Sequence, residues 1–328
     1  MTRTWKKTVA LVAAMALALV AVACGSDSKS GSGGGSSGGD KGANLIKKDS
    51  ANASKKKIVV GSKNFDEQFI LGEIYAQALQ AAGFKVEKKL NLGAEQIAYK
   101  ALKAGQVDAY PEYTGTSLTS FFGVKTDAVP KDPDKAYALA KKDYAKQGIV
   151  AMPRTSFENT FRIATTKAKA KDKLKGAKTV SEVAKLPNAS TLSIAGFPEC
   201  QQRSDCYQGL KKKYGWSPKF VSDQGKYQPI DKGRSDLGFV FSTDGELTLG
   251  KYTIIADDKG LFPPFNISLG VKDATYKELG KEGQGVILSI QKPLTEKVMQ
   301  ELNSRVSLDK QEPKAVAAAY LKENGFTK

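Results

Sequence analysis

Histidine is absent from this 328-residue chain, and cysteine is scarce, with three residues. Zinc sites and Ser-His-Asp triads depend on histidine, so the sequence argues against both. Cys200 and Cys206 are six residues apart, which is not the C-x-x-C spacing of a metal or redox site. Asp108 and Glu112 are the nearest approach to a carboxylate pair, but a turn separates them. We therefore expect no metal, no cofactor and no enzymatic activity.

Acidic residues are outnumbered by basic ones, 34 against 51, which gives a net charge of +17. The first residues carry three of these charges and residues 24–57 a net four, so about +10 remains on the rest of the chain. Nucleic-acid binding is one explanation of such a surplus. Scattered lysines and the export signal described next favour a solvated basic surface beside an anionic membrane instead.

The N-terminus has the pattern of a bacterial export signal. Arg3, Lys6 and Lys7 precede the apolar run Val9–Val22, which is too short and too close to the N-terminus to favour a permanent span. Small residues before Cys24 resemble a lipobox, although Ala21 stands where leucine is usual. We expect a signal peptide over 1–23, a lipid on Cys24, and anchoring to the outer face of the cytoplasmic membrane. The alternative is an ordinary signal peptide with a chance cysteine.

Glycine and serine dominate the segment that follows Cys24, and such a composition behaves as a flexible tether. We assign residues 24–56 to this tether. Exported domains are in an oxidising compartment, so we expect Cys200 and Cys206 to form a small local disulfide.

Strand and helix patterns alternate from Ile58 onward, which predicts an α/β fold with a parallel βαβαβ unit at its start. Asn64 with Glu67 three residues later predicts a capping box for a helix that Gly83 ends. The predicted strands are Ile58–Gly61, Phe84–Leu92, Val107–Tyr110, Ile149–Met152, Phe161–Thr165, Thr191–Ala195, Lys219–Val221, Leu237–Phe241, Tyr252–Ala256 and Asn266–Val271. The later predicted helices are Glu95–Ala104, 134–147, Cys206–Tyr214, Thr295–Val306 and Pro313–Glu323.

Three sequence blocks carry a resemblance to a known family: G-S-K-N-F-D-E-Q from Gly61, Y-P-E-Y-T-G-T from Tyr110, and F-S-T-D-G from Phe241. They resemble, in the same order, the substrate-binding proteins of ABC importers for glycine betaine, carnitine, choline and proline. The resemblance implies a two-lobe periplasmic-binding-protein fold of type II, with a hinge of two chain crossings near 153–157 and 261–265. Lobe 1 would comprise 57–156 and 263–328, and lobe 2 would comprise 157–262.

The resemblance also implies a ligand site between the lobes. A methylated ammonium cannot donate hydrogen bonds and is held by aromatic faces, whereas a ligand carboxylate needs N–H donors. The family blocks point to Tyr113, Thr116, Tyr110, Asn159, Phe161, Phe241, Thr243, Asp244 and Phe265. Arg203, inside the expected disulfide ring, is a candidate carboxylate clamp, and Gln68 is a weaker candidate. We expect Lys63 to be solvated.

Positions 161, 241 and 265 are usually tyrosine in relatives that bind quaternary amines, and all three are phenylalanine here. The resemblance implies a small-molecule solute and an ABC permease as partners, with attachment to the membrane through the lipid. The change to phenylalanine leaves open a same-fold receptor for another solute, such as ergothioneine or a bile acid. A ligand-sensing surface domain is a further alternative.

Overall fold

The computed structural model describes residues 44–328. The predicted signal segment 1–23, Cys24 and the tether as far as residue 43 lie outside the described residues. Among the helices of 44–328, none combines the length and the apolar character needed to cross a membrane.

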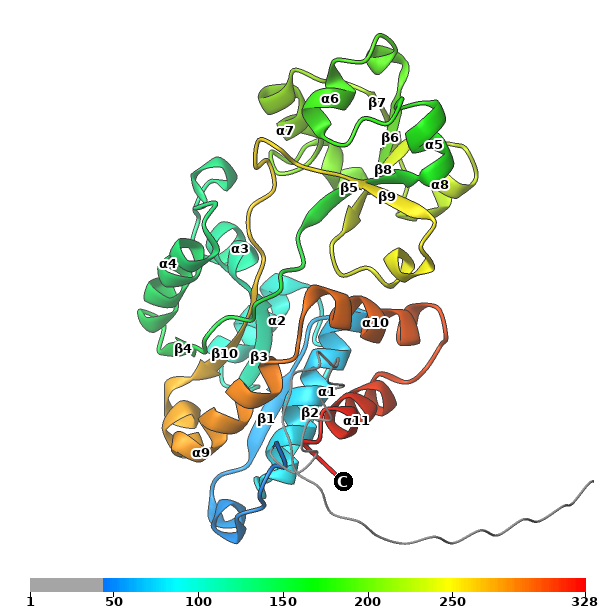
Figure 1. The fold of residues 1–328 in the computed structure, drawn as a ribbon. Coiled ribbons are helices and arrows are strands. Elements are labelled where there is room, and N and C mark those ends of the chain that lie inside the picture. The colour runs from blue at the N-terminus through cyan, green and yellow to red at the C-terminus, as the bar shows by residue number, and fades with distance from the viewer. Residues whose placement is uncertain (1–43) are drawn as a thin grey trace, which may run out of the picture. The chain divides into compact units, whose positions relative to one another are not determined.

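Two five-stranded sheets organise the fold (Figure 1). The first has the order β2 (Val86–Lys89), β1 (Ile58–Gly61), β3 (Ala109–Tyr113), β10 (Ile267–Lys272) and β4 (Ile149–Ala151). Strand β1 runs parallel to β2 and β3, as the short βαβ connections predict. Strand β10 is antiparallel to β3, with Ile267 opposite Tyr113. The α/β class is therefore confirmed.

The second sheet repeats this arrangement. Its order is β7 (Lys219–Ser222), β6 (Ser193–Gly196), β8 (Leu237–Phe241), β5 (Phe161–Thr166) and β9 (Tyr252–Ile255). Strand β6 is parallel to β7 and β8, and β5 is antiparallel to β8 and β9. The β5–β8 register sets Phe161 opposite Phe241, so two aromatic side chains meet at the end of this sheet.

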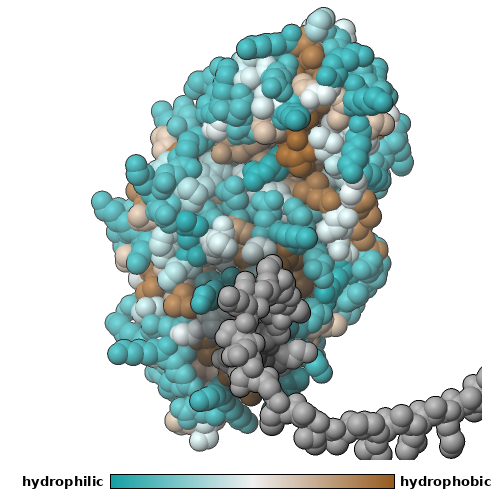
Figure 2. Space-filling model, in the orientation of Figure 1, coloured by the Kyte–Doolittle hydropathy of each residue, from teal (hydrophilic) through white to brown (hydrophobic). Residues whose placement is uncertain are grey.

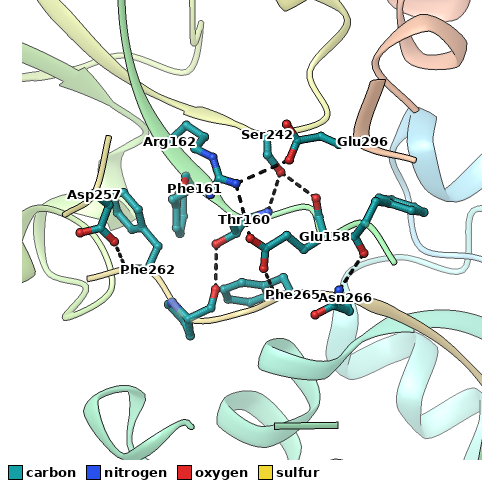
Figure 3. Close-up of polar contacts among 12 residues, drawn as sticks. Glu158, Thr160, Phe161, Arg162, Ser242, Asp257, Phe262, Phe265, Asn266 and Glu296 are labelled. Atoms are coloured by element: carbon teal, nitrogen blue, oxygen red, sulfur yellow. Dashed lines mark hydrogen bonds and ion pairs between the residues drawn. The ribbon is translucent and has the colours of Figure 1, made fainter. Parts of the chain in front are cut away.

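Two chain segments connect the sheets, one from β4 to β5 and the other from β9 to β10. They run antiparallel to each other: the Thr155 amide donates to the Ile267 carbonyl, and the Asn159 amide to the Phe265 carbonyl. Figure 3 shows how Ser242 is held beside them, since its hydroxyl donates to the Glu158 carbonyl and accepts from the Thr160 amide. Polar contacts thus fix the two crossings to each other and to the end of β8.

Helix α1 (Asp66–Ala81) follows β1 and is the most buried helix of the first sheet. Its two apolar rows, headed by Ile70 and Leu71, are buried. Gly83 adopts φ +97 just after the helix, as a helix-ending glycine does. The expected capping box is wrong: the helix begins at Asp66, its cap position is Phe65, and no side chain caps it.

The C-terminal helices α9 (Asp273–Gln291), α10 (Glu296–Ser307) and α11 (Pro313–Glu323) share a core with α1 and the first sheet. Gln291 donates to the buried Tyr75 hydroxyl, and the Tyr320 hydroxyl donates to the Ile290 carbonyl. Helix α9 contains one non-helical residue, Gly280. The chain therefore returns to the first sheet after building the second.

Part of the predicted tether packs against the folded domain. The Ile46 amide donates to the Phe326 carbonyl, and the buried Asn52 side chain donates to the Ala82 carbonyl. A Cβ on Gly83 would lie 2.3 Å from the Asp49 carbonyl oxygen, so that glycine permits the close approach. Structured chain consequently begins before Lys57, because these groups have hydrogen-bond partners just after α1 and α11.

The other helices are shorter or lie at the edges of the sheets. They are α2 (Glu95–Lys103), α3 (Thr114–Thr116), α4 (Pro133–Ala145), α5 (Lys167–Asp172), α6 (Val180–Ala184), α7 (Tyr207–Gly209) and α8 (Gln228–Asp231). The helix expected over Cys206–Tyr214 is divided into α7 and a wider turn over Leu210–Tyr214. The face drawn in Figure 2 is covered mainly by hydrophilic residues, in keeping with a solvated basic surface.

Candidate functional site

A cleft of about 720 Å³ lies between the two sheets and is lined by residues from both. One wall is formed by the end of β3 and the start of α1, and the other by the start of β5 and the ends of β6 and β8. Open α/β sheets bind ligands at the carboxyl ends of their parallel strands, and this cleft has that position.

Six aromatic rings line the cleft. The first sheet and its helices contribute Phe65 and Tyr113, the second sheet contributes Phe161, Phe197 and Phe241, and the crossing before β10 contributes Phe265. Phe65 is 39% exposed, an unusual environment for so large an apolar ring. Five of the six are phenylalanine, so their edges offer almost no hydrogen-bonding groups to a ligand.

Phe161 is the centre of an aromatic cluster on the second sheet. It stacks on Phe241 with ring centroids 4.8 Å apart and lies nearly parallel to Phe197 at 6.0 Å. Across the cleft, Phe65 stacks on Tyr113 at 6.2 Å. Each wall therefore presents stacked rings rather than a single isolated face.

The protein's own cations already lie over these rings. Lys63 Nζ is 4.4 Å from the centroid of the Tyr113 ring, and Lys226 Nζ is 5.2 Å from that of Phe241. The Arg203 guanidinium is 5.4 Å from the Phe161 centroid. Rings of the cleft lining therefore already accept positive charge on a face, as their quadrupole favours.

Arg203 is held by its neighbour Asp205. Arg203 Nε and Nη2 donate to the two carboxylate oxygens of Asp205, at 2.8 and 2.6 Å. These hydrogen bonds raise the pKa of Arg203, which stays charged. The expected disulfide between Cys200 and Cys206 is present and closes the loop that carries this pair. Arg203 lines the cleft, but the edge of its guanidinium that carries Nε and Nη2 is already hydrogen-bonded to Asp205.

Lys63 is buried, contrary to the expectation that it is solvated. Its ammonium forms an ion pair with the buried Glu112, which also accepts from the Tyr110 hydroxyl at 2.9 Å. Burial and the Glu112 charge raise the pKa of Tyr110 well above its ordinary value, so this phenol stays a neutral donor. Lys63, Glu112 and Tyr110 therefore form a buried hydrogen-bonded group, of which Lys63 lines the cleft.

Glu67 is the most deeply buried carboxylate of the cleft lining, with 3% of its surface exposed. Its Oε1 accepts from the Tyr113 hydroxyl at 2.7 Å and from Asn159 Nδ2 at 3.0 Å, and its Oε2 accepts from Asn303 Nδ2 at 2.9 Å. Burial and the negative charge of Glu67 raise the pKa of Tyr113 well above its ordinary value. Helix α1, β3, the first crossing and α10 all converge on this one carboxylate.

Asp244 organises the turn after β8. It forms an ion pair with Lys226, and it accepts from the Phe241 amide at 2.8 Å and from the Tyr227 hydroxyl at 3.2 Å. The adjacent Thr243 carbonyl accepts from Asn303 at 2.7 Å, which joins this turn to α10. The turn is thereby fixed at the cleft and tied to the opposite wall.

The structure brings together most of the residues that the sequence singles out. Those that line the cleft are Tyr113, Thr116, Asn159, Phe161, Arg203, Phe241, Thr243, Asp244 and Phe265. Tyr110 and Gln68 differ from expectation, since both are fully buried outside the lining. Tyr110 points to the opposite face of β3 and joins the core with Tyr99, and Gln68 Oε1 accepts from the Lys63 amide.

Several lining residues are absent from the sequence-based set, among them Phe65, Glu67, Phe197, Lys226 and Asn303. Phe65 and Glu67 fall inside the G-S-K-N-F-D-E-Q block, so the family resemblance of that block could have indicated them as site residues. Phe197 follows β6 directly, and a strand end beside the cleft was its signal. Nothing local marks Lys226 or Asn303, because their place depends on the packing of distant segments.

Comparison with known proteins gives a consistent family. The family model for the substrate-binding domain of ABC-type glycine betaine transport systems (OpuAC) matches residues 56–323. The chain is 31% identical over 279 residues to a glycine-betaine-binding protein of Pseudomonas aeruginosa, covering 81% of this chain and 87% of that one. It is 28% identical over 285 residues to the glycine betaine-binding protein YehZ of Escherichia coli, covering 83% and 92%.

The fold is also similar to solved structures. This chain aligns with the crystal structure of a glycine betaine/carnitine/choline ABC transporter with a TM-score of 0.72 and 25% identity. The alignment covers 81% of this chain and 98% of that one. The relatives named here are binding proteins and not enzymes.

Proposed function

This chain belongs to the family of substrate-binding domains of ABC-type glycine betaine transport systems, and we propose that it is a lipid-anchored extracytoplasmic receptor for a small quaternary amine or betaine. The ligand would be held in the cleft between the two sheets and delivered to the membrane permease of an ABC importer. Relatives that are glycine betaine-binding and carnitine transport binding proteins support this class of solute.

The main support for the proposal is that six aromatic rings line the cleft and that five of them already have a cationic side chain within 6 Å of the ring centroid. A trimethylammonium group is large, weakly hydrated and unable to donate hydrogen bonds, so aromatic faces are the protein surface that suits it. Desolvated cation–π contacts are worth about 2 kcal/mol or more. Five phenylalanines and one tyrosine supply those faces with little competing polarity.

Delivery requires that the cleft open and close. We propose that the two crossings, near 153–157 and 261–265, form the hinge between lobe 1 (57–156 and 263–328) and lobe 2 (157–262). The antiparallel hydrogen bonds between the crossings support a paired hinge. Anchoring would follow from a lipid on Cys24, which places the receptor on the outer face of the cytoplasmic membrane.

A thermal-shift screen of the mature chain tests the proposal. The panel contains choline, glycine betaine, carnitine, ergothioneine, proline and a bile acid. A ligand at a hundred times its dissociation constant adds about 2.7 kcal/mol to stability, which raises the melting temperature by several degrees. We expect at least one quaternary amine to do so and proline and the bile acid to do nothing. A shift with proline or the bile acid alone would reject the assignment.

A further inference from the structure

The charge on the cleft lining is opposite to that of the chain. Three cationic side chains line it: Lys63, Arg203 and Lys226. Five carboxylates line it: Asp66, Glu67, Glu95, Asp244 and Glu246. The lining is therefore net negative in a protein of net charge +17.

Pairing makes this imbalance larger. Each of the three cations already has a carboxylate partner: Lys63 with Glu112, Arg203 with Asp205, and Lys226 with Asp244. Within residues 44–328, the carboxylates of the other four acidic lining residues have no Lys or Arg nitrogen within 4.0 Å. These four are Asp66, Glu67, Glu95 and Glu246. The cleft thus holds spare negative charge and no spare positive charge.

Glu67 is the one buried member of these four. All its hydrogen-bond donors are neutral: the Tyr113 hydroxyl and the side-chain amides of Asn159 and Asn303. Buried carboxylates are ordinarily paired with a cation, because neutral donors offset only part of their lost hydration. The position of Glu67 on the cleft floor lets a ligand supply that cation.

Two further oxygens stand beside it. Asn159 and Asn303 direct Nδ2 at the Glu67 carboxylate, and in the described part of the chain their buried Oδ1 atoms have no hydrogen-bond partner. Both residues line the cleft. Carbonyl oxygens without donors add partial negative charge around Glu67 and favour a positively charged group there.

We propose that Glu67 makes this receptor selective for ligands with a net positive charge, so that a monocationic quaternary amine such as choline binds more tightly than the zwitterion glycine betaine. This inference rests on the proposed function. The cation would face Glu67, with aromatic rings around its methyl groups.

The cleft is unfavourable for the carboxylate of a zwitterion such as glycine betaine. This carboxylate needs a cationic donor, and the positive charge of each cation in the lining is already balanced by a carboxylate: Arg203 by Asp205, and the two lysines by Glu112 and Asp244. It would also enter a lining that already carries four unpaired carboxylates, and like charges repel strongly where water is excluded. Choline carries no carboxylate and therefore avoids this repulsion.

Titration calorimetry of the mature chain with choline and with glycine betaine tests this selectivity. The wild type should bind choline at least about tenfold more tightly than glycine betaine. Glu67→Gln, which keeps the size and removes the charge, should lower choline affinity at least about tenfold and glycine betaine affinity far less. Glu282→Gln is the matched control: it removes the same charge from an exposed position on α9 outside the cleft lining, and the affinity ratio should stay within about threefold.

Each outcome is decisive. A wild type that binds glycine betaine as tightly as choline, or more tightly, overturns the proposal without any variant. A Glu67→Gln protein that loses both affinities by the same factor assigns Glu67 a structural role only, and overturns it too. Absence of binding of both ligands to the wild type also overturns the choline selectivity, whereas the proposed function itself fails only if no quaternary amine of the thermal-shift panel binds.

Discussion

The Tyr113 hydroxyl donates a 2.7 Å hydrogen bond to Glu67, and this contact joins the end of β3 to the first turn of α1. It fixes the aromatic ring at the cleft surface and the carboxylate beneath it. The ring and the charge are the two features that a quaternary ammonium requires. Tyr113 therefore supplies an aromatic ring to the cleft and also holds the Glu67 carboxylate in place.

Truncation of Tyr113 should therefore weaken the binding of a quaternary amine. Tyr113→Ala removes the ring, and we expect at least a tenfold loss in affinity, about 1.4 kcal/mol, measured by calorimetry. Tyr113→Phe keeps the ring and removes only the hydroxyl, so its loss should be smaller. Equal losses for the two variants would show that the hydrogen bond to Glu67, and not the aromatic face, is responsible.

The framework around Tyr113 could be predicted because it depends on local pattern. Strands β1 and β3 and helix α1 follow from alternation, from the apolar rows of α1 and from the stop at Gly83. The sequence places Tyr113 at a strand end, where the structure finds it in the cleft. Tyr110 was misplaced because side chains three residues apart on a strand point to opposite faces.

The sequence marks the block that contains Glu67 but does not indicate that this carboxylate lies in the cleft. Its local pattern suggests helix capping, whereas its hydrogen-bond partners Asn159 and Asn303 are 92 and 236 residues away. The sequence also could not show whether Arg203 is free to bind a ligand carboxylate. Its pairing with Asp205 is a matter of loop geometry, which the spacing of the two cysteines does not define.

Loss of the disulfide should lower stability by a modest amount. Closing so short a loop contributes about 2 kcal/mol in the chain-entropy model, so Cys200→Ala/Cys206→Ala should lose about that much free energy of unfolding in urea. A reducing agent should lower the stability of the wild type to the same extent and leave the double variant unchanged. Identical urea curves for the wild type with and without reductant would contradict a stabilising role.

Gly245 permits a close contact between the two walls of the cleft. A Cβ at this position would lie 2.6 Å from the backbone of Ser304 on α10. Gly245→Ala should therefore destabilise the protein by about 1–3 kcal/mol in urea denaturation, because α10 or the turn must move.

Gly285 provides the control for that substitution. It lies in α9, and a Cβ there would meet nothing within 4 Å. Gly285→Ala should be neutral or stabilising by roughly 0.5–1 kcal/mol, since alanine is the better helix former. If Gly245→Ala behaves like Gly285→Ala, the turn after β8 does not press on α10 in solution.

Lipidation is predicted at Cys24, which lies outside the described residues. Cys24→Ala should move the protein from the membrane fraction to the soluble fraction of fractionated cells, because the lipid alone would hold it. Mass spectrometry of the wild type should find a diacylglycerol on the N-terminal cysteine of the mature chain. A Cys24→Ala protein that stays in the membrane fraction uncleaved would mean that Val9–Val22 acts as a membrane anchor.

The most direct test of a quaternary-amine receptor is titration calorimetry with choline and its neutral isostere, in which a tert-butyl group replaces the trimethylammonium group. The two ligands share size and shape and differ in charge. We predict that choline binds at one site per chain, at least about thirtyfold more tightly than the isostere, which corresponds to roughly 2 kcal/mol. Equal affinities would show an apolar cleft without cation recognition and would contradict the account, as would a failure of choline, glycine betaine and carnitine all to bind.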